Sequence, residues 1–284
     1  MFGQNKKKRN KSGTKRSLRI VSASSSFGYI EAYKALRTNL SYVMEAGGQH
    51  SKIVMITSSV PAEGKSNVSI NLAVTLAEEH KKVILLDCDL RKGTLHRYLR
   101  IPRHVAGITE FLGEEAELKD VILRFNDLGI DVMTAGMVPP NPSELLGSEK
   151  MGKLLTALSK EYDYVLCDTP PVNAVTDTTV LSRYADGAVL VVSHNKVTRE
   201  NVLAAKEQLE KNSTQIFGVV LNMYDAKKTG TDNSKYYSYY NYNYQYGSYN
   251  YGVSAGHSQH KGADTKATRK EESGRTHRDV KETQ

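Results

Sequence analysis

Short runs of apolar residues alternate with amphipathic stretches through the middle of the chain. The apolar runs lie at 53–56, 83–86, 165–167, 188–192 and 219–221. Stretches with helical periodicity lie between them, at 67–79, 145–160, 176–184 and 199–211. Because short buried strands that alternate with helices indicate βαβ units, the pattern predicts an α/β fold with a mostly parallel, doubly wound sheet. We expect one domain over residues 20–225.

An amphipathic helix is predicted ahead of the first strand, over residues 31–44. Its sequence EAYKALRTNLSYVM places Tyr33, Leu36, Leu40 and Val43 on one face at helical spacing. Charged and polar side chains take other positions. Such a helix can pack its apolar face on the core of its own subunit or on a neighbouring subunit.

Both ends of the chain are too polar to join a core. The formal net charge is +8, and residues 1–19 hold eight basic side chains and no acid, so the remainder is near neutral. A tail rich in Lys, Asn, Ser and Gly cannot offset its ordering entropy by apolar burial, and we predict that residues 1–19 are disordered. Anionic lipid, nucleic acid and plain solvation all suit such a tail, although nucleic acid is not a partner that we expect.

A cluster of tyrosines dominates the C-terminal region. Aliphatic residues almost vanish beyond residue 225, and the stretch 236–251 packs nine tyrosines among Ser, Asn, Gln and Gly. This tyrosine cluster has no Val, Ile, Leu or Phe, so it cannot form a conventional core or a strand with one apolar face. We therefore predict a disordered tail over 226–284 with accessible tyrosines. The alternative is an adhesive low-complexity segment.

No apolar run approaches the roughly 18 to 20 residues that a membrane-spanning helix needs. The basic N-terminal stretch has no apolar segment behind it, so we expect no secretory signal. Cys88 and Cys167 lie in or at the ends of predicted buried strands, which suits reduced thiols in the cytosol. We therefore expect a cytoplasmic protein.

A Gly-Lys-Ser sequence stands where the first strand is followed by a helix. Gly64 lets a backbone approach closely, Lys65 supplies a mobile positive charge, and Ser66 has a hydroxyl placed to ligate Mg²⁺. A helix N-terminus adds unpaired N–H groups and a positive dipole end, so we predict a phosphate-binding loop. The predicted nucleotide contacts of this loop are Ala62, Glu63, Gly64, Lys65, Ser66 and Asn67. The strict pattern would have Gly where Ser59 stands.

Acidic residues follow two further predicted strands. Asp87 and Asp89 come at the end of the apolar run in VILLDCDLR and project on the same side, because strand side chains alternate. Asp168 ends the strand in YDYVLCDTPP. Ligands bind at the carboxyl ends of strands in open α/β sheets, so these carboxylates are expected to face the phosphates. There, one can help hold Mg²⁺ and another can accept a proton from an attacking hydroxyl.

These motifs resemble those of a known family. SSVPAEGKS, VILLDCDLR and YDYVLCDTPP look like the Walker A, Walker A′ and Walker B motifs of the bacterial protein-tyrosine kinases (BY-kinases) of capsule and exopolysaccharide operons, and GMVPPNPSELL is similar to a stretch typical of that family. The resemblance covers residues 20–251. It implies a deviant P-loop NTPase fold of the Min/Par type, Mg-ATP as the cofactor, assembly as a ring, and phosphorylation of the C-terminal tyrosines of a neighbouring subunit.

The resemblance also implies roles for individual residues. Lys65 and Ser66 match the Walker A lysine and metal ligand. Asp87 and Asp89 match the Walker A′ acids, with Asp87 the expected base for the tyrosine hydroxyl. Asp168 matches the Walker B acid. The catalytic residues are then Lys65, Asp87 and Asp89, and the metal ligands are Ser66, Asp87 and Asp168.

Two further assignments rest on the same resemblance. In related P-loop ATPases, an Asn that ends a strand like GVVLN lies near the adenine, and Asn222 takes that position here. The expected phosphate acceptors are Tyr236, Tyr237, Tyr239, Tyr240, Tyr242, Tyr244, Tyr246, Tyr249 and Tyr251. Each phosphate would add about −1.5 to −2 charges, and the resulting repulsion would favour ring disassembly.

The ring-forming motif departs from the family pattern, which reads Glu-x-x-Arg-x-x-Arg. This chain has Glu31, Lys34 and Arg37, and lysine keeps the charge but loses the bidentate geometry of arginine. We still expect these residues to form the ring contact. The chain resembles the split form of the family, so the expected partners are a membrane chain-length regulator, whose cytoplasmic tail completes the ATP site, and a cognate tyrosine phosphatase. These partners imply a location at the inner face of the cell membrane.

Two other functions fit part of the pattern. A Min/Par-type partitioning ATPase shares the fold, but such proteins resemble one another in an additional lysine ahead of the P-loop lysine, where this chain has Val60, and they lack a Tyr-rich tail. A non-catalytic ATP-dependent scaffold would keep the nucleotide site and use its tails for partners. Weak ATP hydrolysis fits any of these functions, because water can attack wherever tyrosine can.

Overall fold

The computed structural model describes residues 20–46 and 53–224. The predicted tails at 1–19 and 226–284, and with them the tyrosine cluster, lie outside the described residues. Their predicted disorder and the predicted domain boundaries therefore stay predictions.

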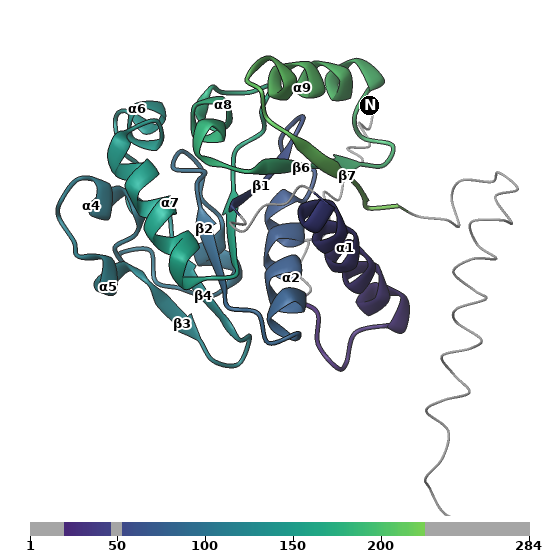
Figure 1. Cartoon of the computed structure of the whole chain (residues 1–284), viewed down its shortest axis with the longest axis horizontal. Coiled ribbons are helices and arrows are strands. Elements are labelled where there is room, and N and C mark those ends of the chain that lie inside the picture. Colours follow the sequence, from purple (N-terminus) through teal and green to yellow (C-terminus); the bar gives the residue numbers. More distant parts are fainter. Residues whose placement is uncertain (1–19, 47–52, 225–284) are drawn as a thin grey trace, which may run out of the picture. The chain divides into compact units, whose positions relative to one another are not determined.

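A seven-stranded sheet forms the centre of the described part (Figure 1). In sheet order, its strands are β3 (Leu123–Phe125), β4 (Ile130–Met133), β2 (Val83–Asp87), β5 (Tyr164–Asp168), β1 (Ile53–Ser58), β6 (Gly187–Ser193) and β7 (Ile216–Asn222). All neighbouring strands are parallel except β3 and β4. The predicted mostly parallel sheet is therefore confirmed.

Helices cover both faces of the sheet (Figure 1). On one face lie α1 (Phe27–Ala46), α2 (Lys65–Ala77) and α3 (Leu95–Tyr98). On the other lie α4 (Ile108–Leu112), α5 (Leu118–Val121), α6 (Pro142–Leu146), α7 (Glu149–Glu161), α8 (Asp177–Leu181) with the 3-10 turn η1 (Ser182–Tyr184), and α9 (Arg199–Lys211). Alternate residues of β1 enter the two cores, Val54 on the first side and Met55 on the second. The sheet is doubly wound, as predicted.

The structure corrects one predicted helix. The stretch 145–160 is not continuous, since α6 ends at Leu146 and α7 begins at Glu149. Ser148 between them has an extended backbone, and its hydroxyl accepts a hydrogen bond from the N–H of Met151, which caps α7. Helical periodicity continues across this break, so the apolar pattern alone did not reveal it. The predicted helix at 199–211 matches α9.

α1 extends the predicted helix at 31–44 in both directions, to Phe27–Ala46. Tyr33 and Leu40 are buried, and Leu36 and Val43 are partly buried against the same core as α2. The predicted apolar face is confirmed, and it packs on its own subunit. In the described part of the chain, no helix combines the length and the apolar character that crossing a membrane requires.

The three predicted ring residues have partners within their own subunit. The Lys34 ammonium lies 2.9 Å from the carboxylate of Glu31 on the same helix. The Arg37 guanidinium donates to the backbone oxygen of Thr75 at 2.9 Å and pairs with Glu79, so it ties α1 to α2. The role of these residues in a ring stays a prediction.

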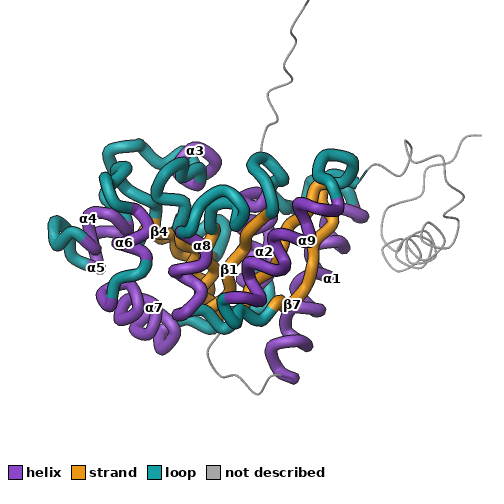
Figure 2. The backbone as a smooth tube through the Cα atoms, turned by 90° about the horizontal axis from the view of Figure 1, so that it is seen from above, coloured by secondary structure: helices purple, strands orange, loops and turns teal. Residues whose placement is uncertain are grey.

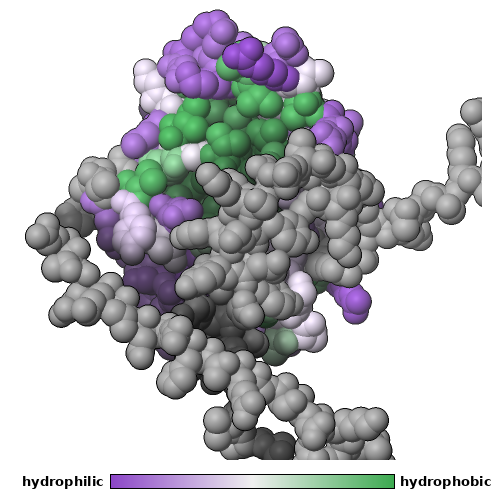
Figure 3. Space-filling model, turned by 90° about the vertical axis from the view of Figure 1, so that its right-hand side faces the viewer, coloured by the Kyte–Doolittle hydropathy of each residue, from purple (hydrophilic) through white to green (hydrophobic). Residues whose placement is uncertain are grey.

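The edge strand β7 carries an exposed hydrophobic surface. Val219 and Leu221 are 59% and 54% exposed, and Leu203 of α9 is 44% exposed. Figure 3 shows a hydrophobic area on this side of the molecule, bordered by hydrophilic side chains. An apolar edge strand can pair with another chain.

The topology gathers three loops at one edge of the sheet. β2, β5 and β1 are adjacent and parallel, with Asp87 opposite Asp168 and Asp168 opposite Ile56. The loops that lead from β1 to α2, from β2 to α3 and from β5 to α8 therefore start side by side. Figure 2 shows loops crowded at the ends of the strands. This edge is where an open α/β sheet binds its ligand.

The packing of α1 gives a stability prediction. Leu40→Ala removes a side chain that is 3% exposed, and it should lower the free energy of unfolding by about 2–5 kcal/mol. Tyr42 on the same helix is 65% exposed, so Tyr42→Ala should change that free energy by less than about 0.5 kcal/mol. Urea denaturation measures both changes. Equal losses in the two variants would contradict the packing of α1 on the core.

Candidate active site

The loop between β1 and α2 has the backbone that a bound anion requires. α2 begins at Lys65, and Gly64 ahead of it has φ 90° and ψ 19°. A Cβ at Gly64 would lie 2.2 Å from the Asn222 amide nitrogen, so only glycine fits there. The first N–H groups of α2 have no partner within the helix and can hold an anion. The backbone of this loop therefore suits the phosphate-binding role that the sequence predicts.

The side chain of Glu63 holds this loop in place through buried hydrogen bonds. Its buried carboxylate accepts hydrogen bonds from the N–H and the hydroxyl of Ser59, both at 2.7 Å, and from the N–H of Val60 at 2.9 Å. Its other oxygen accepts the N–H of Ser193 at the end of β6, at 2.8 Å. Glu63 was predicted as a nucleotide contact, and its side chain instead holds Ser59, the residue that departs from the strict motif. Its backbone alone remains for a phosphate.

Two asparagines of the predicted nucleotide set also brace the loop. The Asn222 amide donates to the backbone oxygen of Glu63 at 2.8 Å. Asn67 accepts the Tyr33 hydroxyl of α1 at 3.2 Å, so its side chain faces α1. Whether Asn222 also lies near the adenine stays a prediction.

Lys65 lies between two carboxylates. Its ammonium is 3.4 Å from Asp89 and 3.5 Å from Asp168. Burial lowers the pKa of Lys65, but the charges of Asp168, Asp89 and Asp87 outweigh burial, and the net shift is upward. The lysine is thus a fixed positive charge at the start of α2. The structure brings together the catalytic residues predicted from the three motifs.

Asp87 and Asp168 are fully buried and each keeps one oxygen without a partner among the described residues. Burial, followed by the charge of Asp168, raises the pKa of Asp87 to about 8. Burial also raises the pKa of Asp168, although Lys65 and Ser66 oppose the shift. Buried carboxyl groups with free oxygens favour the binding of a cation.

The donor set fits Mg²⁺ bound together with a nucleotide. The described residues contain no group of three or more His, Cys, Asp or Glu side chains arranged to hold a metal ion by themselves. Mg²⁺ does not need one, because it prefers oxygen ligands and completes its shell with water and substrate phosphates. Ser66, whose hydroxyl accepts a hydrogen bond from Thr94 at 3.0 Å, supplies one further oxygen.

Backbone and side-chain contacts hold the loop after β2 in place. The N–H of Leu95 donates to Asp87 at 2.9 Å, and that of Lys92 donates to Asp89 at 3.0 Å. Arg91 forms a bidentate pair with the buried Asp177 of α8, at 2.9 and 3.0 Å.

This pair connects the loop to α6 and α8. Arg91 also donates to the Ser143 hydroxyl of α6 at 3.1 Å, and Ser143 in turn donates to Asp177 at 2.5 Å. Sequence reasoning did not single out Asp177. The available signal was that Arg91 lies in VILLDCDLR and Ser143 in GMVPPNPSELL. The sequences of these two motif segments alone give no reason to expect a contact between them.

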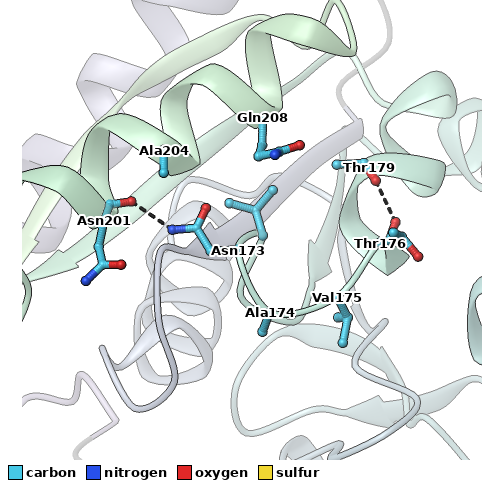
Figure 4. A pocket seen from close by; sticks show the side chains of 9 residues that line it. Asn173, Ala174, Val175, Thr176, Thr179, Asn201, Ala204 and Gln208 are labelled. Atoms are coloured by element: carbon cyan, nitrogen blue, oxygen red, sulfur yellow. Dashed lines mark hydrogen bonds between the residues drawn. The ribbon is translucent and has the colours of Figure 1, made fainter.

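A separate pocket of about 410 Å³ lies between the loop after β5 and α9. Asn173, Thr176 and Gln208 are among its lining residues, and the Asn173 amide donates to the backbone oxygen of Asn201 at 2.8 Å (Figure 4). None of the residues lining it is charged. It therefore lacks the chemistry of the site around Lys65, which we take as the active site.

The fold and the site together define a P-loop NTPase. A family model described as ParA, NUBPL iron-transfer P-loop NTPase, matches residues 49–253 and agrees with this class. Nucleotide binding follows from it, as predicted.

Comparison with individual proteins shows which family of P-loop NTPases the chain belongs to. Tyrosine-protein kinase YwqD of Bacillus subtilis (strain 168) is 40% identical over 192 residues, which cover 68% of this chain and 80% of that protein. Tyrosine-protein kinase CpsD of Streptococcus agalactiae is 35% identical over 192 residues, covering 68% and 82%. The kinase domain of Escherichia coli tyrosine kinase ETK has a TM-score of 0.68 at 37% identity, covering 71% of this chain and 78% of that one. The chain therefore belongs to the bacterial tyrosine-protein kinases, and the predicted family, fold and enzyme class are confirmed.

The burial of Asp87 gives a pH prediction for the protein without metal or nucleotide. Because its pKa is higher in the folded than in the unfolded chain, the folded state binds more protons between the two values, and stability falls as the pH rises through this range. Asp87→Asn removes this loss. From about pH 5 to about pH 9, the variant should gain on the order of 1–3 kcal/mol over the wild type.

Urea denaturation in the presence of EDTA measures this difference. Asp127→Asn, which changes an exposed carboxylate, is the matched control and should show no such trend. A difference between Asp87→Asn and the wild type that stays constant with pH would contradict the effect of burial on Asp87.

Proposed function

We propose that this kinase binds Mg-ATP and transfers the γ-phosphoryl group to tyrosines of the tyrosine cluster on a neighbouring subunit. The observation that supports this most is the pair of buried carboxyl groups, Asp87 and Asp168, each with a free oxygen beside the P-loop lysine. A buried pair of acids is costly unless a cation joins it. A metal-bound triphosphate meets that need.

Each side chain has a proposed part in binding or transfer. Lys65 and the first N–H groups of α2 hold the phosphates, and Asp89 keeps Lys65 in position through its 3.4 Å contact. Ser66 and Asp168, together with Asp87, are the residues that would hold Mg²⁺. Bound Mg²⁺ would neutralise charge on the β and γ oxygens.

Asp87 is the proposed base. One of its oxygens is held by the N–H of Leu95, which leaves the other to orient the tyrosine hydroxyl and take its proton, so that its part in holding Mg²⁺ would run through a water molecule. Burial raises the pKa of Asp87 in the protein without metal, and the positive charge of bound Mg²⁺ would lower it again and keep the carboxylate able to accept a proton. Transfer itself then depends on positioning and charge stabilisation.

The tyrosine cluster is the proposed acceptor because it offers nine hydroxyls in a polar segment without aliphatic residues. Several phosphates would make the segment strongly anionic. Repulsion between modified tails and the acidic site would then favour dissociation of the ring. Unchanged oligomer size after full phosphorylation would count against this switch.

The partners and setting are proposals of the same kind. We propose a homo-oligomeric ring, with Glu31, Lys34 and Arg37 near its contacts, a membrane chain-length regulator whose cytoplasmic tail completes the ATP site, and a tyrosine phosphatase that reverses the modification. The kinase would then work in the cytoplasm at the inner face of the membrane and regulate capsule or exopolysaccharide synthesis and export.

The rival functions have less support. The relatives are named tyrosine-protein kinases, which favours phosphoryl transfer to tyrosine over the function of a partitioning ATPase. A non-catalytic scaffold would keep the nucleotide site but would need no proton acceptor at Asp87, and the kinase names of the relatives favour catalysis.

Intact-mass measurement tests the proposal. The wild type, the Lys65→Met variant and a mixture of the two are incubated with Mg-ATP. We expect several phosphates on the wild type, at least about a hundredfold less on the variant alone, and phosphates on the variant chain in the mixture. Lys206→Met, at an exposed position of α9, is the control and should behave as wild type.

The mass of the modified peptides locates the phosphates, which should fall within 236–251. ATP hydrolysis with no phosphate on any chain, even with a candidate activator tail present, would overturn the kinase proposal in favour of a partitioning-type ATPase.

A further inference from the structure

A basic strip follows the active-site acids. Residues 91–104 contain five Arg or Lys and two His, and the chain has no acid from residue 90 to residue 109. The strip leaves the loop that carries Asp89, passes through α3 and runs on toward α4. Figure 2 places α3 among the loops at the end of the sheet.

Most cations of the strip have no acidic partner. Arg91 is paired with Asp177, but Lys92, Arg97, Arg100 and Arg103 are exposed and form no ion pair with another described residue. Their combined positive charge affects a neighbouring histidine. Burial, and then the charges of Arg103 and Arg97, lower the pKa of His96. Uncompensated positive charge of this kind attracts an anion.

The strip borders a recess with two chemically different walls. Lys92 and Arg103 supply the cationic side, and His96 lines the recess with them. Pro102, Val105 and Val138 supply an apolar side, and Val138 belongs to a loop in which Met137 is 72% exposed. The recess is small, about 40 Å³, so an anionic group attached to a flat ring would place its phosphate against the cationic side and lay the ring over the apolar side.

The recess adjoins the proposed base. Gly93 lines it, and a Cβ at Gly93 would come within 2.8 Å of the Asp87 oxygen that accepts the N–H of Leu95, on the same carboxyl group as the free oxygen. An acceptor tyrosine at Asp87 therefore lies beside the strip. A group bound in the recess and a tyrosine at Asp87 can belong to one short peptide.

From this juxtaposition we infer that the recess binds a phosphotyrosine of the tyrosine cluster from a second copy of the chain, and so holds the next tyrosine of that cluster near Asp87. The inference rests on the proposed function and adds a product-binding site to it. Tyrosines two positions apart in an extended segment are about 7 Å apart, and the cluster repeats tyrosines at this spacing from Tyr240 to Tyr246.

The consequence is processive phosphorylation. The first phosphate is added without help from the strip, since the unmodified cluster carries no charge. Later phosphates follow faster, because the newest phosphotyrosine keeps the segment bound; repulsion and dissociation of the ring follow only once most of the cluster is modified. Partly modified chains should therefore be rare early in the reaction.

Peptide binding tests the site directly. The full-length Lys65→Met chain, which makes no phosphotyrosine of its own, is titrated with a peptide of residues 236–251, either unmodified or phosphorylated at Tyr244. We expect the phosphopeptide to bind at least ten times more tightly, and Arg103→Gln, which removes the guanidinium that lines the recess, to remove that advantage. Lys160→Gln/Arg199→Gln, which removes two exposed cations elsewhere, should keep it.

The kinetics test the consequence. In the otherwise active chain, Arg103→Gln should add the first phosphate at the wild-type rate within about twofold, while intermediate phosphorylation states accumulate in intact-mass spectra. Equal affinity for the two peptides would overturn the inference. Binding of phosphatidylserine vesicles that Arg103→Gln weakens, without binding of the phosphopeptide, would also overturn it and assign the strip to a membrane surface. Either result leaves the kinase proposal standing if phosphotyrosine still forms.

Discussion

Buried acidity at the carboxyl edge of the sheet is the constraint on which the site depends. Asp87, Asp89 and Asp168 are 1%, 7% and 0% exposed, and Lys65 is the cation that lies between them. One lysine does not satisfy three carboxyl groups, and two oxygens stay without partners among the described residues. The arrangement is therefore poised for a further positive charge, which a metal-bound nucleotide would bring.

The rest of the domain holds these charged groups in fixed positions. Without that support, solvation by water would draw them apart. Neighbouring parallel strands place Asp87 opposite Asp168, so their separation is a property of the sheet. Glu63 fixes the phosphate loop to β6, and the Arg91–Asp177 pair fixes the following acidic loop to α8. These contacts around the site keep its charged groups in one geometry, which phosphoryl transfer requires.

The sequence was informative where a residue's position determines its surroundings. Asp87 and Asp168 end apolar runs, and strand ends meet at one edge, so their meeting was predictable. β3 and β4 were not predicted, because LRF and IDVM are too short to show a pattern. The buried bonds of Glu63 and the partnership of Arg91 with Asp177 depend on contacts between distant segments, which periodicity does not encode. Ser148 could have been recognised as a cap, but the apolar pattern across it was continuous.

A crystal structure of the chain with Mg²⁺ and a non-hydrolysable ATP analogue tests the central claim most directly. We expect the β and γ phosphates against Lys65 and the start of α2, with the metal bonded to the Ser66 hydroxyl and reaching the free oxygens of Asp87 and Asp168 directly or through water. A nucleotide bound elsewhere, or bound at the loop while both carboxyl oxygens stay without a partner, would contradict it.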